Sequence, residues 1–147
     1  MASCREETTF LYEVEPITVK QEGSDKNNLK STTEFISIAY TDIFGKSIPT
    51  AALQTLNVTY NAFGDKKLIE DRIIRGFLNN PSAVIPASVS VNNDTLLFIT
   101  NTYKKLYNRN PNEFEKTYIW ELIRENQQLT PKIIYYSLMT ADEYRYY

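Results

Sequence analysis

The sequence contains no histidine, one cysteine and only four glycines in 147 residues. Without an imidazole the chain has no Ser-His or Cys-His catalytic pair and no histidine ligand for zinc or haem. A single cysteine cannot form an internal disulfide. The glycines fit neither G-x-x-x-x-G-K nor G-x-G-x-x-G, so the main signature of nucleotide binding is missing. These absences predict a protein that is not an enzyme and that holds no cofactor, metal or nucleotide.

The charge balance excludes a further class of partner. Sixteen basic and eighteen acidic residues give a net charge of -2, so the chain has no overall positive field to hold a phosphate backbone. We therefore expect no nucleic acid partner. With 42% apolar and 23% charged residues, the composition is typical of one globular domain that buries a core.

The first residues resemble the end of a bacterial lipoprotein signal, in which small residues precede a cysteine that carries lipid. Met1-Ala2-Ser3-Cys4 matches this ending, and Arg5-Glu6-Glu7 resembles a surface-export signal of some Bacteroidota lipoproteins. The resemblance implies a lipid on Cys4 that anchors the protein to the outer membrane, on its periplasmic or surface face. The charged and apolar regions that open a signal peptide are missing from this sequence, so we interpret it as a lipoprotein trimmed at its lipobox, with Met1 as an added start codon. An ordinary cytosolic protein with a free cysteine near its end is the alternative.

Between this ending and the first helical pattern, the sequence predicts an extended tail. Polar and apolar residues alternate from residue 10 to residue 19, as in an extended segment. Residues 20–28 are polar and lack a period, which predicts a flexible linker. We therefore assign residues 1–30 to a lipid-anchored tail and residues 31–147 to a helical domain.

Two blocks of the helical domain recur in the same order. Residues 35–46 align with 98–109, and residues 72–78 align with 132–138. The identical pairs in the first block are Phe35/Phe98, Ile36/Ile99 and Tyr40/Tyr103. A self-similar period of about 60 residues indicates duplication of one unit.

The repeat predicts an all-α fold of two tandem three-helix units packed as one bundle. The first unit spans residues 31–80, a crossover spans 81–93, and the second unit spans 94–147. Alternation at 87–91 leaves open one short strand in the crossover. The aligned residues Phe35, Phe98, Ile73 and Ile133 are expected in the core.

Helix signals divide each unit into three. In the first unit, Ser31-x-x-Glu34 predicts a capping box that opens a helix, and Gly45 predicts the left-handed residue that ends it. Pro49 predicts the first turn of a second helix, and Asp65 predicts the N-cap of a third.

In the second unit, Asp94 or Thr95 and then Thr130-Pro131 predict helix starts. Asn110-Pro111-x-Glu113 predicts the start of a helix whose inward residues are Phe114, Tyr118 and Leu122. Thr140-x-x-Glu143 predicts a last capping box.

One phrase of the second unit resembles a known family. Tyr103-x-x-Leu-Tyr-x-Arg-x-Pro-x-x-x-Glu115, followed by Thr140-Ala-Asp-Glu-Tyr144, is similar to phycobilisome linker domains and to helical linker modules of bacterial surface proteins. The resemblance covers about fifty residues, and the first unit departs from it. It implies an assembly or scaffold role, without pigment binding.

Two functions remain open. The first is a non-catalytic envelope lipoprotein, an accessory or scaffold subunit that binds another envelope protein. Eight of the eleven tyrosines follow residue 100, and tyrosine is enriched at interfaces. We therefore predict a partner-binding surface at Tyr107, Tyr135, Tyr136 and Tyr144.

The second is a small carbohydrate-active hydrolase, because glycoside hydrolysis needs two carboxyl groups and no histidine. The candidate residues are Asp42, Asp65, Glu70 and Asp71. Two facing carboxylates in the groove between the units would favour this alternative. A groove lined by tyrosines would favour a binding protein.

Overall fold

The structure is a computed structural model that describes residues 26–86, 94–126 and 128–146. Cys4, most of the predicted tail and the possible strand at 87–91 lie outside these residues. The described helices are α1 (Thr32–Phe44), α2 (Thr50–Ala62), α3 (Lys66–Leu78), α4 (Asp94–Tyr107), α5 (Glu113–Glu125) and α6 (Pro131–Thr140), followed by the 3-10 turn η1 (Asp142–Arg145). The predicted all-α class is confirmed.

The first three helices begin and end as their sequence signals predict. The Ser31 hydroxyl accepts a hydrogen bond from the Glu34 backbone N–H at 3.3 Å, and the Glu34 carboxylate accepts one from the Ser31 N–H at 2.7 Å. Gly45 ends α1 with a φ of 65°, a left-handed conformation that glycine adopts without steric cost. Asp65 caps α3 by accepting from the Leu68 N–H at 3.0 Å. Pro49 is the N-cap of α2, one residue before its first turn.

The second three helices depart from the predictions at two caps. The capping box of α5 is made by Asn112 and Glu115, because α5 begins at Glu113 rather than at Asn110. The predicted box of Thr140 and Glu143 is wrong: the Thr140 hydroxyl donates to the Tyr136 carbonyl, and Glu143 binds Arg109 instead. Thr130 caps α6, with Pro131 in its first turn, as predicted.

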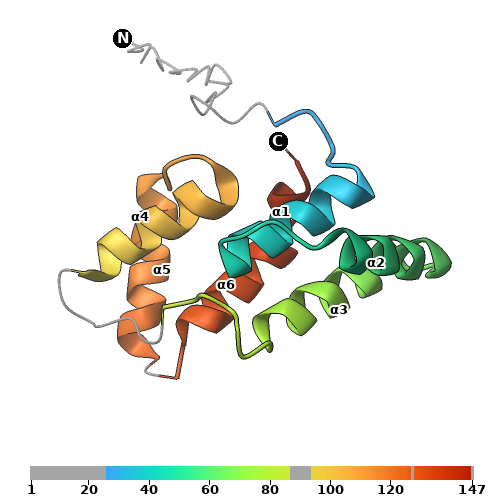
Figure 1. The fold of residues 1–147 in the computed structure, drawn as a ribbon. Helices are drawn as coiled ribbons and strands as arrows, with labels where there is room; N and C mark the ends of the chain where they lie inside the picture. The colour runs from blue at the N-terminus through green and yellow to red at the C-terminus, as the bar shows by residue number, and fades with distance from the viewer. Residues whose placement is uncertain (1–25, 87–93, 127, 147) are drawn as a thin grey trace, which may run out of the picture.

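The helices pack in an order that is compatible with two three-helix units. α1 contacts α2 and α3, while α4 contacts α5 and α6. α3 and α6 lie side by side at the centre of the molecule and join the two groups (Figure 1). Superposition of the two units stays a prediction.

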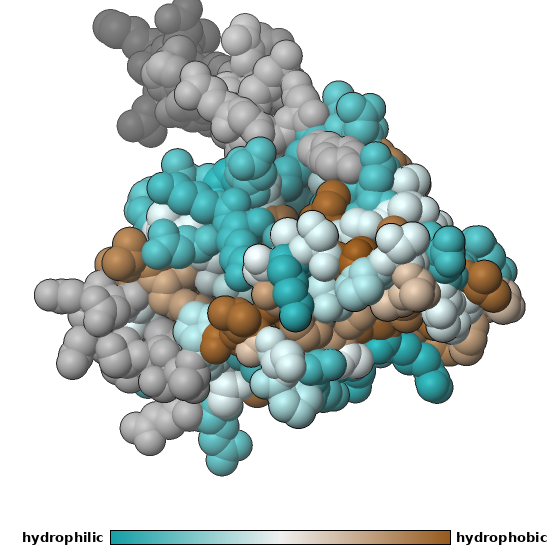
Figure 2. All heavy atoms as spheres, viewed as in Figure 1, coloured by the Kyte–Doolittle hydropathy of each residue, from teal (hydrophilic) through white to brown (hydrophobic). Residues whose placement is uncertain are grey.

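One core runs through both groups of helices. Its fully buried side chains include Phe35, Ile36, Ile43 and Ile74 from the first group and Ile99, Met139 and Tyr144 from the second. On the face drawn in Figure 2, hydrophobic residues form separate patches between hydrophilic ones.

The four residues expected in the core have different positions. Phe35 and Ile73 are buried, as predicted, but Phe98 is only partly buried. Ile133 is 43% exposed, so its predicted burial is wrong. The reason is that α6 buries Pro131, Ile134, Leu138 and their helical neighbours, and Ile133 lies beside that stripe.

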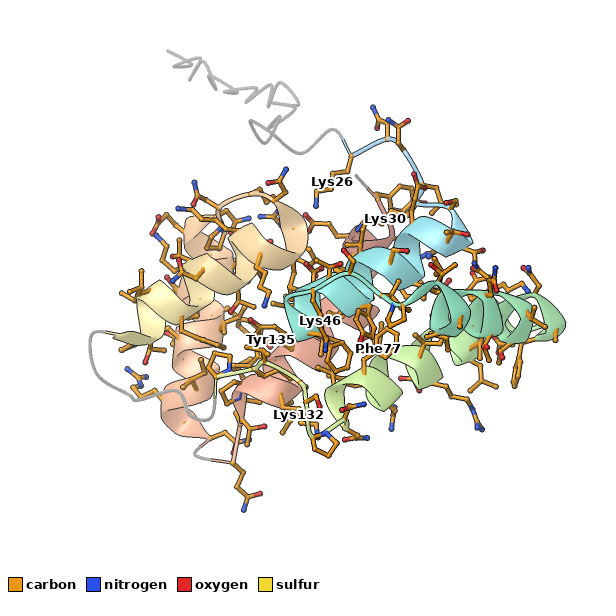
Figure 3. All side chains as sticks on the ribbon, viewed as in Figure 1. Lys26, Lys30, Lys46, Phe77, Lys132 and Tyr135 are labelled. Atoms are coloured by element: carbon orange, nitrogen blue, oxygen red, sulfur yellow. The ribbon has the colours of Figure 1, made fainter. Side chains whose placement is uncertain are left out.

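The first described residues pack against the last. The Lys30 N–H donates to the Arg145 carbonyl at 2.8 Å, and Leu29 forms an antiparallel bridge with Tyr146. Lys30 is buried, and Lys26 pairs with Glu143 at 3.4 Å. Figure 3 shows both lysines above α1, near the C-terminal turn. The end of the predicted linker therefore belongs to the folded domain.

Candidate functional site

The residues of the linker-like phrase meet around Arg109. Its guanidinium binds Glu143 through Nε at 2.6 Å and Nη2 at 2.7 Å, and it binds Glu115 through Nη1 at 2.8 Å and Nη2 at 2.7 Å. The same guanidinium lies over the rings of Tyr103 and Tyr107, with centroids 5.2 and 5.5 Å away. Two bidentate carboxylates and two aromatic faces use most of the binding capacity of one arginine. We call these five residues the Arg109 cluster.

The electrostatics of the Arg109 cluster favour its charged state. Burial raises the pKa of Glu115 and Glu143, but the hydrogen bonds and charge of Arg109 outweigh burial and leave both below their ordinary values. Burial raises the pKa of Tyr103 to about 12. All of these groups are therefore fixed in one ionisation state near neutral pH, which suits a structural role rather than proton transfer.

Arg109 also connects the end of α4 with α5 and η1. Glu115 belongs to the first turn of α5, where it completes the capping box, and Glu143 belongs to η1. Arg109 follows α4, so one side chain connects three elements of the second group. The Arg109 cluster therefore accounts for this motif through folding alone.

Three of the four predicted partner-binding tyrosines are buried within the chain. Tyr107, Tyr135 and Tyr144 are 3%, 4% and 0% exposed. The Tyr107 hydroxyl donates to the Leu138 carbonyl at 2.8 Å, and the Tyr144 hydroxyl donates to Asp42 at 2.6 Å. Their burial removes the exposure that the prediction required, because these rings fill the core beside α1 and α6.

Tyr136 is the member of this set that stays partly exposed. Its hydroxyl donates to Asp71 at 2.6 Å and accepts from Arg75 at 2.6 Å, and the Arg75 guanidinium lies 4.9 Å from its ring centroid. Tyr136 thus links α6 to α3 and leaves part of its ring on the surface.

The candidate catalytic carboxylates form caps, hydrogen bonds and ion pairs within the chain. Asp65 caps α3. Asp42 is partly buried and accepts a hydrogen bond from the Tyr144 hydroxyl at 2.6 Å. Burial raises the pKa of Asp42 above its ordinary value, although the Tyr144 hydroxyl opposes this shift.

Glu70 and Asp71 line a hollow of about 510 Å³. Tyr60, Asp142 and Arg145 line the same hollow. Glu70 accepts from the Tyr60 hydroxyl at 2.7 Å and pairs with Arg145 at 3.3 Å. The hydrogen bond from Tyr136 lowers the pKa of Asp71, with Arg75 adding to the effect. The hollow therefore contains both carboxylates and tyrosines, and Asp71 is held as an anion rather than as a proton donor.

The surface that the sequence misses lies on α5. Phe114, Tyr118 and Leu122 are 77%, 52% and 38% exposed, so their predicted inward orientation is wrong. α5 has a second apolar set, Ile119, Trp120 and Ile123, which packs against the core instead. The sequence does contain a signal for this exposed surface, because α5 has apolar residues on two faces. A monomeric domain can bury only one of these faces against α4.

The exposed face of α5 combines aromatic and acidic side chains. The Phe114 and Tyr118 rings stack at 5.9 Å with planes 10° apart. At 100° per residue, Glu121 and Glu125 fall within the same sector of about 100° as Phe114, Tyr118 and Leu122. We call these five residues the α5 stripe.

The described residues hold neither a cluster of metal ligands nor a membrane-spanning helix. No group of three or more acidic or cysteine side chains within that part of the chain could hold a metal ion. None of its helices combines the length and apolar character that crossing a bilayer requires. No known protein family, curated protein or solved structure matches this chain.

Proposed function

We propose that this protein is a non-catalytic accessory or scaffold subunit that binds another protein of the cell envelope through the α5 stripe. The observation that carries the proposal is the exposure of Phe114 and Tyr118, two stacked rings that contact solvent beside a complete core. Contiguous exposed apolar patches mark protein interaction sites, and tyrosine and phenylalanine are enriched at the centres of protein interfaces.

The structure supports this surface because it is rigid. Glu115 fixes the first turn of α5 through the Arg109 cluster, and Ile123 anchors the opposite face of the helix in the core. The Arg124 guanidinium also lies 4.7 Å from the Trp120 ring centroid on the same helix. A helix held in this way loses little conformational freedom when a partner binds.

The membrane anchor is the second part of the proposal. Cys4 lies outside the described residues, so its support remains the Ala2-Ser3-Cys4 ending. A lipid on Cys4 would hold the helical domain at the membrane by a tether of about 20 residues, which spans several tens of ångströms at ~3.4 Å per residue. The α5 stripe would then meet proteins at that distance.

The hydrolase alternative has less support. Its candidate groups cap a helix, bind a buried tyrosine or pair with Arg75 and Arg145. A glycosidase needs one carboxyl group with a raised pKa in an open groove. Asp42 has the raised pKa but does not line the 510 Å³ hollow.

Photocrosslinking tests the partner surface. A photoreactive phenylalanine analogue replaces Tyr118 in the producing organism, and a matched probe replaces Val58, which is 70% exposed on α2. We expect an envelope protein to crosslink at 118 and not at 58. The purified partner should then bind wild type and Val58→Ala equally, but bind Phe114→Ala/Tyr118→Ala at least about tenfold more weakly. Equal crosslinking at both positions would reject the α5 stripe.

Mass spectrometry of the membrane fraction tests the anchor. The full-length gene is expressed in a host that processes lipoproteins, with Cys4→Ser as the matched control. We expect acylated wild type in the membrane fraction and unmodified variant outside it. Unmodified wild type in the soluble fraction would end the anchor hypothesis and leave the partner surface to be judged separately.

A further inference from the structure

A small groove lies where the end of α3 meets the start of α6. It has a volume of about 210 Å³ and is lined by Arg75, Leu78, Asn79, Lys132, Ile133 and Tyr136. An apolar cavity of about 150 Å³ accommodates a benzene ring. The α3–α6 groove therefore has room for one aromatic side chain.

The floor of this groove is apolar and its rim is positive. Ile133 is 43% exposed and Leu78 is buried, while Lys132 is exposed next to Ile133 in the first turn of α6. Arg75 bonds Asp71 and Tyr136 yet keeps 59% of its side chain exposed. Figure 3 shows Lys132 at the start of α6, below Phe77 of α3.

The α5 stripe has the complementary chemistry. Tyr118 lies one helical turn from Phe114 on one side and one turn from Glu121 on the other. An aromatic ring in the groove would therefore bring the Glu121 carboxylate toward the cations of the rim. Opposite charges that flank an apolar contact fix its register and increase the association rate.

We infer that the protein associates with a second copy of itself, with Tyr118 of one copy in the α3–α6 groove of the other and Glu121 facing Lys132. The two surfaces belong to different helices, so each copy offers both a stripe and a groove to its neighbour. The inference goes beyond the proposed function, although it uses the same α5 stripe. It adds a defined occupant, namely another copy of this chain.

A charge exchange tests the contact in the purified full chain. Lys132→Glu places Glu121 of one copy against a negative rim, and Glu121→Lys places a lysine against Lys132. Each variant alone should associate at least about tenfold more weakly than wild type. An equimolar mixture of the two should recover association, because the positive stripe of the Glu121→Lys copy then meets the negative groove rim of the Lys132→Glu copy. Sedimentation velocity over a concentration series measures these constants.

Two control variants test whether a charge change or a truncation elsewhere on the surface also alters association. Lys104→Glu changes the charge on α4 by the same amount, and Val58→Ala truncates an exposed apolar side chain on α2; both should sediment like wild type. Circular dichroism confirms that each variant is folded. Added salt should weaken wild-type association, because it screens the exposed charges.

Two results would overturn the inference. The first is a wild type that stays monomeric throughout the series, and the second is a mixture of the exchanged variants that fails to recover association. Either result leaves the proposed function intact if an envelope protein still crosslinks at position 118. Conversely, recovered self-association without an envelope partner would reject the proposed function and keep the inference.

Discussion

The two groups of helices bury side chains of different chemistry. Among the described residues, α1 to α3 bury one tyrosine, Tyr60, and otherwise hydrocarbon side chains such as Phe35 and Ile36. From α4 to η1 the buried tyrosines are Tyr103, Tyr107, Tyr135 and Tyr144. A buried phenol needs a hydrogen-bond partner, so the second group needs polar partners that the first group largely does without.

The tyrosines of the second group also join the two groups of helices. Tyr144 donates to Asp42 of α1, and Tyr136 donates to Asp71 of α3. Two tyrosines of the second group therefore bind two aspartates of the first. The same residue type that suggests a partner surface in the sequence serves in the structure as the internal contact between the halves.

The largest effect should come from the hydrocarbon core of the first group. Phe35→Ala removes a fully buried ring that contacts Tyr144 edge-on at 6.1 Å, and it should lower the free energy of unfolding by about 3 to 5 kcal/mol. The aligned change Phe98→Ala should cost less, about 1 to 2 kcal/mol, because Phe98 is only partly buried. Urea denaturation measures both. Equal losses would mean that the two groups share one packing pattern after all.

The next effect should come from the Arg109 cluster of the second group. Arg109→Met removes the arginine that Glu115 and Glu143 share, at 23% and 30% side-chain exposure, and leaves Glu143 with Lys26 alone as a cationic partner. We expect a loss of about 2 to 3 kcal/mol at pH 7, reduced from the value for a fully buried pair because of this exposure. Arg124→Met, which changes a half-exposed arginine on α5, is the control and should cost less than about 1 kcal/mol.

Acid should diminish the difference between Arg109→Met and wild type. The folded-state pKa values of Glu115 and Glu143 lie below the ordinary value. Their contribution is therefore present above the unfolded pKa of about 4.3 and is lost as the pH falls through the lower, folded-state pKa. A difference that stays constant between pH 7 and pH 3 would contradict this assignment.

A smaller effect should follow from the contact between the halves. Tyr144→Phe keeps the ring in the core but removes the donor to Asp42, and it should cost about 1 to 3 kcal/mol. Tyr118→Phe, which deletes an exposed hydroxyl, should leave the free energy of unfolding unchanged within about 0.5 kcal/mol. Thermal and urea denaturation distinguish the two. If both variants match wild type, the Tyr144 hydroxyl contributes nothing to joining the halves.

The smallest effect should appear as a pH dependence at Lys30. Burial lowers its pKa from 10.5 to about 8, with Lys26 adding to the shift. Between these two values the unfolded chain binds one more proton than the folded chain at this site, so the stability contributed by Lys30 rises with pH. Relative to Lys30→Met, wild type should gain about 1 kcal/mol between pH 7 and pH 9. A flat difference over that interval would show that Lys30 keeps its ordinary pKa.

Local signals in the sequence predict the helices well because each depends on a few adjacent residues. The capping box at Ser31, the left-handed Gly45 and the Asp65 cap all form as their neighbours require. The box predicted at Thr140 fails because the Glu143 carboxylate has a stronger partner in Arg109, more than thirty residues away. A local pattern cannot reveal a distant competitor.

The candidate surface could not be predicted because α5 has apolar residues on two faces. The orientation of α5 depends on which of the two faces packs against α4. The pattern of apolar residues does not distinguish them. The tyrosines pose the same difficulty, since a phenol serves equally well at an interface or in a core with an acceptor such as Asp42. Burial, which separates these roles, is a property of the whole fold.

The pairing of Leu29 with Tyr146 has a mechanical consequence. In an antiparallel bridge the two segments run in opposite directions, so the segment that enters at Leu29 and the segment that ends at Tyr146 face the same side of the domain. A load applied between the two ends would therefore separate the backbone contacts one at a time, beginning with this bridge and then the Lys30 bond to Arg145. Contacts that open one after another resist force less than contacts that are sheared together. A tether pulled from Leu29 would therefore separate Leu29 from Tyr146 before the helices unfold.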